Sequence, residues 1–589
     1  MASLSPSSHS TLTTDIEKFP ENVAPTIATS RPASRQSQMS QKDNQETKAK
    51  EMGSIVQQPY EHKFLTGPKL YMALSAATLA CFLVLLDSSI ITTAIPQITS
   101  EFQSLLDVGW YGSAYQLTSS AFQPFSGKIY AHFSTKWSFL VFFFFFELGS
   151  LLCGAAQSSV MLIVGRAVAG IGSSGLINGG LTIVSACLPV QKQAAATGIL
   201  ISFTQLGIAL GPLLGGAFTE YVSWQWCFYI NLPVGAVVAG FILLIDIPES
   251  TRKLPVRQVL NTAFSSLDLI GLTIFAPSAV MFFLALSWGG NDYAWGSATI
   301  IGLFCASFVT IIIFLLWERK KGDDAMVPFS MLRMQSMWAA SSTMFFFMGV
   351  LFVANYYLPI YYQTVRGKSP IMSGVDMLPI VLFQVLLAMA SGVLVQKFGY
   401  YLPFVLGGSA LTAIGYGLYS TLGSSSSTGH WVGFEILFGI GAGSAGAMAF
   451  ISLQTSIPAA KISIAMGILL FFQNLGGAIW LAISQIIFSS SLRSTIPHYA
   501  PAVDADVVIA AGANSVRVIT SGDDLKGVLL AYSRSVNRVM YLGVGLAVGA
   551  WICGWGMGWR DIRVKKVVEG EGVEGESPSE KNVEGDVAV

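Results

Sequence analysis

Three charged residues stand in otherwise apolar stretches of the sequence, where they could carry chemistry. Asp87 lies in LDSSIITTAIP, Glu147 in FELGSLLCG and Arg166 in VGRAVAGIG. Burial disfavours a charged carboxylate, whereas a nearby arginine favours it. A carboxyl group held between these influences can load a proton from one side of a membrane and release it to the other. We therefore predict proton coupling by these three residues, with Arg166 beside one of the two acids and all three facing a central cavity. The alternative is a static ion pair that fixes helix register.

The composition says what surrounds these charges. Of 589 residues, 52% are hydrophobic and 11% are charged, and the mean hydropathy is +0.59. Soluble proteins average about 25% charged residues, so a soluble enzyme, a nucleic-acid binder and a disordered scaffold are disfavoured. Lys plus Arg and Asp plus Glu number 33 each, so no net charge points to a polyanionic partner. These numbers predict an all-α polytopic membrane protein.

A helix needs about 20 apolar residues to cross a bilayer, and the sequence holds fourteen such stretches. They are 71–95, 108–128, 137–156, 160–184, 195–218, 227–246, 268–288, 298–317, 338–361, 374–396, 402–421, 431–455, 463–488 and 539–558. Lys and Arg gather on one set of connections, whereas the short loops of the other set hold only Arg366 and Lys368. The positive-inside rule then places both tails in the cytoplasm.

An internal repeat groups these stretches. SGKIYAHFSTKWSF (126–139) aligns with SGVLVQKFGYYLPF (391–404), and GILISFTQLG (198–207) with GILLFFQNLG (467–476). Both alignments shift the chain by eight stretches, which predicts two pseudo-symmetric halves in a 6+2+6 arrangement, as in transporters built from parallel repeats. The predicted parts are a disordered cytoplasmic N-tail (1–68), an N-terminal six-helix half (69–247), a two-helix insertion (248–325), a C-terminal six-helix half (326–560) with a long extracellular loop (489–538), and a disordered cytoplasmic C-tail (561–589).

The most specific motif is QLGIALGPLLGGAF at 205–218. Glycines four residues apart form one side-chain-free stripe that lets another helix approach closely, and an internal proline can bend the helix. The segment resembles the antiporter motif of the major facilitator superfamily, in particular its fourteen-span drug:proton antiporters. The resemblance covers roughly residues 70–560 and implies the major facilitator fold. It makes the motif a hinge that limits leak, formed by Gly207, Gly211, Pro212, Gly215 and Gly216.

Other segments extend the resemblance. LDSSIITTAIP resembles the family's first-span motif, which favours Asp87 over Glu147 as the proton carrier, and VGRAVAGIGSSGL resembles the fourth-span motif that carries an arginine. FELGSLLCGAAQ and KIYAHFSTKW are similar to fungal toxin-exporting members. The loop after the second span keeps Gly127 and Lys136 of the family's gating motif, but Ala131 replaces its acid. The usual charge latch is therefore partly missing, and His132 and Lys136 are predicted to orient the loop.

Polar side chains within the predicted helices are candidates for substrate binding. Amides hydrogen-bond neutral polar groups without requiring a charge, although each could equally bond helix to helix. Gln205 and the pair Gln473 and Asn474 occupy matching positions in the two halves. The candidates are Tyr115, Gln116, Asn178, Gln205, Asn231, Asn355, Tyr356, Gln473 and Asn474.

Together these features predict a proton-driven exporter of amphipathic drugs, toxins or secondary metabolites. It is expected to be a monomer in the plasma membrane, with the vacuolar membrane as the alternative, and to need no cofactor, metal or nucleic acid. An uptake or vacuolar carrier of siderophores or basic amino acids is the competing interpretation. A sensor would need a large signalling tail. An intramembrane enzyme would need a motif such as HExxH, or GxSxG with a partner histidine, and neither is present.

Overall fold

The computed structural model describes residues 64–103, 107–251, 253, 267–290, 293–511 and 516–563. The predicted tails lie outside these residues except for 64–68 and 561–563. Throughout the described part the chain is helical, and its only β-contact there is a bridge between Gly289 and Tyr293. Serine and aspartate start several of the helices. Ser158, Asp268 and Ser297 each accept a hydrogen bond from a backbone N–H of the first turn, which satisfies a donor that the helix itself leaves free.

The helices follow the predicted order closely. Before residue 250 they are α2 (Pro68–Phe102), α3 (Val108–His132), α4 (Thr135–Gly154), α5 (Ser159–Cys187), α6 (Val190–Tyr221), α7 (Trp226–Tyr229) and α8 (Asn231–Leu244). The pair α11 (Leu269–Trp288) and α12 (Ala298–Lys321) follows. The rest are η2 (Gly322–Asp324), α13 (Phe329–Leu332), α14 (Gln335–Ile360), η3 (Tyr361–Val365), α15 (Pro370–Asp376), α16 (Leu378–Phe398), α17 (Leu402–Tyr419), α18 (Thr428–Gly446), α19 (Met448–Ser456), η4 (Ala459–Lys461), α20 (Ile462–Tyr499), α21 (Ala505–Ala511), α22 (Val516–Ile519) and α23 (Gly522–Trp555).

Thirteen helical segments among the described residues are long and apolar enough to cross a membrane. The predicted stretch 108–128 is not one of them, although it forms the 25-residue helix α3. Its sequence carries serines, glutamines and Lys128, which lower its hydropathy. This helix packs between α5 and α20, so its polar side chains face neighbouring helices and the helix is not surrounded by lipid.

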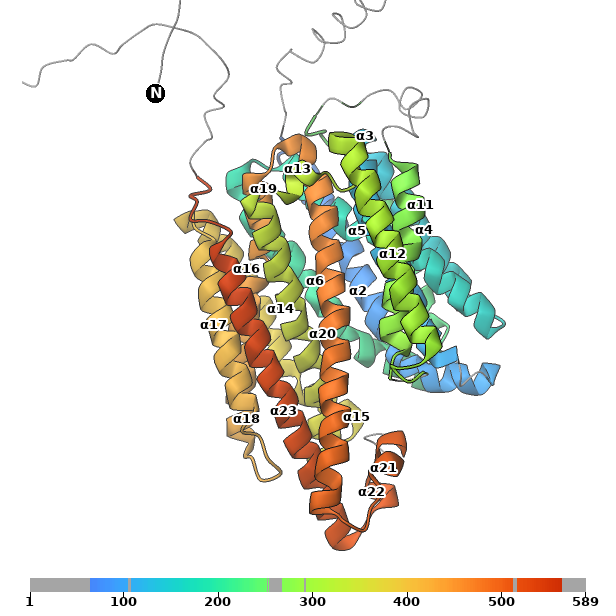
Figure 1. The fold of residues 1–589 in the computed structure, drawn as a ribbon. Coiled ribbons are helices and arrows are strands. Elements are labelled where there is room, and N and C mark those ends of the chain that lie inside the picture. Colours follow the sequence, from blue (N-terminus) through green and yellow to red (C-terminus); the bar gives the residue numbers. More distant parts are fainter. Residues whose placement is uncertain are drawn as a thin grey trace, which may run out of the picture. The chain divides into compact units, whose positions relative to one another are not determined.

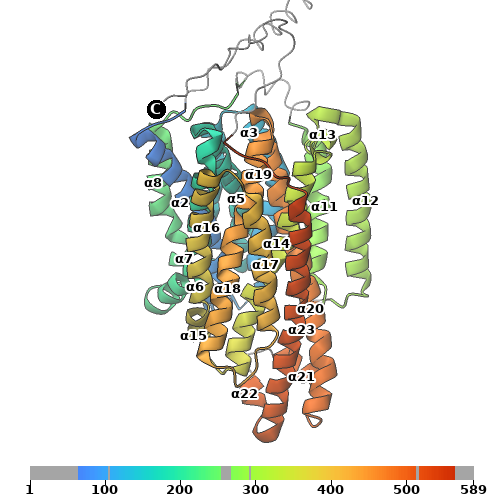
Figure 2. The same ribbon diagram turned by 90° about the vertical axis from the view of Figure 1, so that its left-hand side faces the viewer.

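Helix pairing recurs along the chain at the spacing of the internal repeat. In the first half α2 packs on α6, α3 on α5 and α4 on α5; in the second half α14 packs on α20, α16 on α18 and α17 on α18. The two groups meet through α3 with α20 and through α6 with α16. Helices α11 and α12 pack on each other, and α12 lies at the edge of the bundle in Figure 2.

The segment 489–538 is largely a continuation of two helices. Helix α20 runs on to Tyr499 and α23 begins at Gly522, with the short helices α21 and α22 between them. Asp523 and Asp524 lie in the first turn of α23, where their negative charges interact favourably with the positive end of the helix dipole. The two long helices are drawn in orange and red in Figure 1, and they meet below the rest of the bundle.

The two groups of helices touch at one end of the bundle, which we call the basic end because Lys128, Lys136, Lys192, Lys397 and Lys461 lie there. It is the upper end in Figure 1. A Cβ atom added to Gly127 would lie 2.7 Å from the carbonyl oxygen of Ser463, and one added to Gly198 would lie 2.8 Å from that of Ala388. Glycine is required at such distances. The bundle is therefore closed at the basic end.

Candidate functional site

A fully buried ion pair forms the centre of the first half. Arg166 on α5 lies 2.5 Å from the carboxylate of Asp87 on α2, and the two side chains are 1% and 0% exposed. The Arg166 Nε also donates to the carbonyl oxygen of Tyr111 at 2.9 Å, and its guanidinium lies 4.3 Å from the ring centroid of Tyr115. Asn231 donates to the second oxygen of Asp87 at 3.2 Å. Each charged group therefore has several partners, which offsets its desolvation.

The glycine motif of α6 holds α2 beside this ion pair. Cβ atoms added to Gly207 or Gly215 would fall 2.7 and 2.5 Å from backbone carbonyl oxygens of α2. Ser89, two residues after Asp87, donates to the carbonyl oxygen of Gly207 at 3.1 Å. Gly216 instead faces open space. The stripe thus makes the close contact between α2 and α6 on one face only, and this contact sets the position of Asp87.

Glu147 on α4 occupies a different environment. Both of its carboxylate oxygens are buried and neither accepts a hydrogen bond in the described part of the chain. They lie against Gly235 of α8, where even a Cβ atom would collide with them. Asn231, which bonds Asp87, also donates to Ser150 at 3.0 Å, one turn beyond Glu147. The acid without a partner and the ion pair are thus linked through one asparagine.

These groups do not face a central cavity, contrary to the prediction. The hydrogen-bonding partners of Asp87 and Arg166 all come from α2 to α8, and neither residue lines the cavity between the halves. The prediction rested on the position of each charge along its helix, and that position does not determine which way a side chain points. The ion pair is enclosed within the N-terminal helices, and Asn231 of α8, itself fully buried, contacts it.

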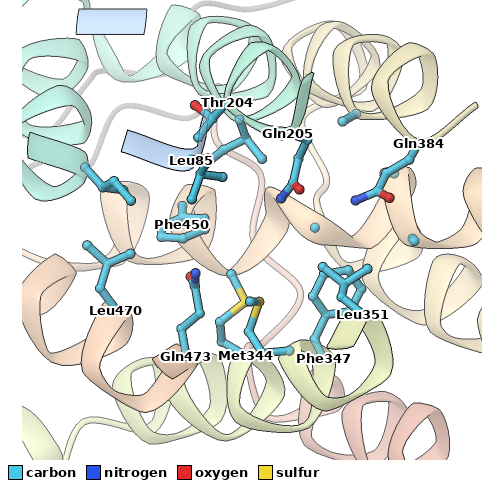
Figure 3. Close-up of a pocket in the computed structure, with 17 residues that line it drawn as sticks. Leu85, Thr204, Gln205, Met344, Phe347, Leu351, Gln384, Phe450, Leu470 and Gln473 are labelled. Atoms are coloured by element: carbon cyan, nitrogen blue, oxygen red, sulfur yellow. The ribbon is translucent and has the colours of Figure 1, made fainter. Parts of the chain in front are cut away.

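A small cavity does lie between the two groups of helices. Its volume is about 50 Å³, and α2, α5, α6, α14, α16, α18, α19 and α20 all contribute to its wall. Three amides, those of Gln205, Gln384 and Gln473, project into it from three different helices, as Figure 3 shows. Much of the remaining wall is apolar, including Met344, Phe347, Met348, Leu351, Phe450 and Leu470. Its volume accommodates water but not a drug-sized molecule, for which pockets span roughly 300–1,000 Å³.

Of the nine predicted substrate contacts, Gln205 and Gln473 line this cavity, and the others do not. Tyr115 and Asn231 belong to the ion-pair cluster, and Asn178 donates to Ser126 at 2.9 Å between α5 and α3. Gln116 and Asn474 are partly buried outside the cavity wall, and Asn355 and Tyr356 are exposed on α14. Gln384 and Thr204 were missed. Gln384 stands within the apolar run LPIVLFQVLLAMA (378–390) of α16, a signal that could have identified it.

The loop between α3 and α4 is held by residues outside its motif. The backbone N–H and hydroxyl of Thr135 donate to the two carboxylate oxygens of Glu249, at 2.7 and 2.8 Å. The Lys253 ammonium donates to the carbonyl oxygens of Tyr130 and Ala131, both at 2.8 Å. Burial lowers the pKa of Lys253, while the nearby Glu249 carboxylate opposes that shift. The segment after α8 thus supplies the charges that the motif lacks.

The three predicted gating residues have separate positions in this region. Gly127 makes the close backbone contact with α20, as described above. Lys136 donates to the carbonyl oxygen of Leu243 at 2.9 Å and lies 3.6 Å from Asp246. His132 ends α3. Lys136 therefore ties the start of α4 to the end of α8, as expected of a residue that orients the loop.

Comparisons with known proteins identify the class. The profile of the Major Facilitator Superfamily matches residues 77–481. The chain is 51% identical over 500 residues to "MFS-type transporter pigP" of Monascus ruber, covering 85% of this chain and 88% of that protein. It is 47% identical over 511 residues to "Efflux pump mlcE" of Penicillium citrinum, covering 85% and 92%. The solved structure of the proton:xylose symporter XylE shares the fold, with a TM-score of 0.53 at 14% identity, covering 82% of this chain and 95% of that one.

The chain belongs to the major facilitator superfamily. It is accordingly a multi-pass membrane transporter and not an enzyme, and its similarity to fungal transporters is confirmed.

Proposed function

We propose that this transporter is a proton-coupled exporter of amphipathic small molecules that works by alternating access. Its fourteen helices, counting α3, would be arranged 6+2+6, with both termini in the cytoplasm and the protein acting as a monomer in the plasma membrane. The helix pairs that recur after eight spans support the arrangement. The antiporter motif on α6 and the similarity to "Efflux pump mlcE" support export.

Proton coupling rests on the contrast between the two buried acids. Asp87 has a counter-ion, Arg166, and a further hydrogen bond from Asn231, whereas Glu147 has neither kind of partner among the described residues. An isolated buried carboxylate is costly, and a protonated one much less so. We therefore assign the transported proton to Glu147 rather than to Asp87, and assign Arg166 and Asp87 the role of the fixed charge beside it. Loss of the proton would create a second anion that competes for Arg166 and Asn231.

The cavity indicates the substrate class. No Asp, Glu, Lys or Arg belongs to its described wall, which combines three amides with methionine, leucine and phenylalanine side chains. Such a wall suits an uncharged molecule that carries a few hydrogen-bonding groups on an apolar skeleton. A carrier of basic amino acids would need an acid in the wall, so this competing function is disfavoured.

Alternating access accounts for the small volume of the cavity. In the present conformation the basic end, which we assign to the cytoplasm, is sealed by Gly127 against α20 and by Gly198 against α16. Thr197 also donates across this seal to Gln454 at 3.0 Å. Substrate would enter from the cytoplasm only after these contacts separate, and their separation would widen the cavity.

Transport by the purified protein in liposomes tests the proposal. A neutral fluorescent dye and an imposed pH gradient would be used to compare the wild type with Glu147→Gln. We expect the gradient to accelerate dye transport by the wild type and to have no effect on the variant, which should still bind dye. Glu220→Gln removes an exposed carboxyl group at the end of α6 and is the matched control. Gradient-driven transport by Glu147→Gln at the wild-type rate would exclude this assignment.

A further inference from the structure

A second and larger cavity lies at the basic end and shares no lining residue with the first. Its volume is about 410 Å³, and it is lined by Arg319, Gly322, Asp323, Phe329, Ser330 and Arg333. These residues belong to the last turn of α12 and to the connection through η2 and α13 that leads to α14. The volume falls within the range of small-molecule pockets.

The charge of this cavity is positive. Arg319 and Arg333 are exposed, and in the described part of the chain neither guanidinium group forms a hydrogen bond or an ion pair with another residue. The acid in the wall, Asp323, is already engaged, because it accepts a hydrogen bond from Ser330 at 2.6 Å and lies 3.9 Å from the ammonium of Lys461. Two guanidinium groups are thus left to bind an anion.

Two buried acidic side chains hold the wall from behind. Asp268 accepts hydrogen bonds from the backbone N–H of Met326 at 3.0 Å and from the indole of Trp317 at 2.8 Å. Burial opposes the charge of Asp268, but these and other hydrogen bonds outweigh it and lower the pKa of this carboxyl group. Glu318 accepts from the N–H of Val327 at 2.7 Å.

A third buried group fixes the same connection to the first half. Lys128 on α3, which is 3% exposed, donates to the carbonyl oxygen of Asp324 at 3.0 Å. The backbone between η2 and α13 is therefore fixed by groups from α3, α11 and α12 at once. A cavity built on a fixed backbone is preorganised, so little ordering is needed when a ligand binds.

We propose that this cavity binds the phosphate of an anionic phospholipid headgroup. Guanidinium groups bind phosphate through paired hydrogen bonds, and basic pockets at the cytoplasmic ends of membrane helices suit such headgroups. The position favours a lipid over free phosphate, because the segment that contains α12 is the least buried of the thirteen candidate spans among the described residues. Phe308 and Leu316 are 66% and 63% exposed along it. Acyl chains lying on α12 would bring their headgroup to Arg319.

Native mass spectrometry of the protein in neutral detergent tests this proposal independently of transport. Phosphatidylinositol and phosphatidylcholine would be titrated separately into the wild type and into the double variant Arg319→Gln, Arg333→Gln. We expect the double variant to bind phosphatidylinositol about thirtyfold more weakly, because it lacks both arginines that attract the anionic headgroup. Its affinity for phosphatidylcholine should equal that of the wild type. The control is the double variant with Lys320→Gln and Lys192→Gln, which removes two exposed charges that lie at the basic end but outside the cavity.

Three results would overturn the proposal. One is unchanged phosphatidylinositol binding by the double variant, and another is an equal loss in the control, which would indicate unspecific attraction. The third is full competition by inorganic phosphate at concentrations comparable to the lipid, which would make free phosphate the ligand. Thermal unfolding of each variant checks its folding, and Arg333→Gln alone replaces the double variant if that protein is unstable.

Discussion

Breaking the buried ion pair should be far more damaging than removing it completely. Arg166 is 1% exposed and lies 2.5 Å from Asp87, so Asp87→Asn leaves a guanidinium charge in the protein interior whose neighbours, including the Tyr115 ring, are all uncharged. Loss of one partner from a buried pair costs about 3–5 kcal/mol, whereas replacing both by uncharged residues of similar volume is often close to neutral. The double variant Asp87→Asn, Arg166→Met should therefore recover most of the stability that Asp87→Asn loses.

Thermal unfolding in detergent, followed by intrinsic tryptophan fluorescence, measures this order directly. The expected sequence of Tm values is wild type, then the double variant, then Asp87→Asn clearly below both. An exposed pair provides the control. Arg493 and Asp506 lie 3.0 Å apart with side chains 63% and 73% exposed, so Asp506→Asn should change stability by less than about 1 kcal/mol. If Asp87→Asn unfolds no earlier than the wild type, the pair does not hold the first half together.

Two further variants test the gate and the cavity. Gly127→Leu places a side chain against backbone atoms of α20. Such overpacking costs about 1–3 kcal/mol, so the population should shift toward the state that is open at the basic end by about five- to hundredfold. Spin labels at Lys192 and Lys397 would show longer distances, whereas Gly216→Leu, which meets open space, should leave them unchanged. Gln384→Leu should weaken binding of a neutral hydrogen-bonding dye about fivefold, because it removes one hydrogen bond worth about 1 kcal/mol. Asn474→Leu, which lies outside the cavity wall, should leave dye binding unchanged. Equal dye affinities for Gln384→Leu and Asn474→Leu would remove Gln384 from the site.

Sequence reasoning worked best where a pattern is local. Runs of apolar residues located the helices, and the eight-span shift of GILISFTQLG onto GILLFFQNLG matched the helix pairs that recur in the structure. The glycines at Gly207 and Gly211 were expected to allow close packing, and both lie against α2. Spacing along a helix determines such contacts because it places small residues on one face.

Features that depend on the direction of a side chain, or on a distant segment, were not predictable in this way. Asp87 and Arg166 were located in the apolar helices, but their enclosure among α2 to α8 depends on how each helix is rotated. Glu249 and Lys253 lie more than 100 residues from the loop they hold, and no motif connects them with Thr135. Helix ends also shifted, since polar residues after 488 continue α20 to Tyr499.

Proton movement during substrate efflux tests the central claim most directly. The purified protein would be placed in liposomes that contain a pH-sensitive dye and a neutral amphipathic substrate, and both fluxes would be followed after a pH gradient is imposed. We expect substrate movement to carry protons in the opposite direction, a protonophore to abolish the gradient-driven component, and Glu147→Gln to lose proton movement. Substrate efflux that continues unchanged after the protonophore collapses the gradient would contradict proton coupling.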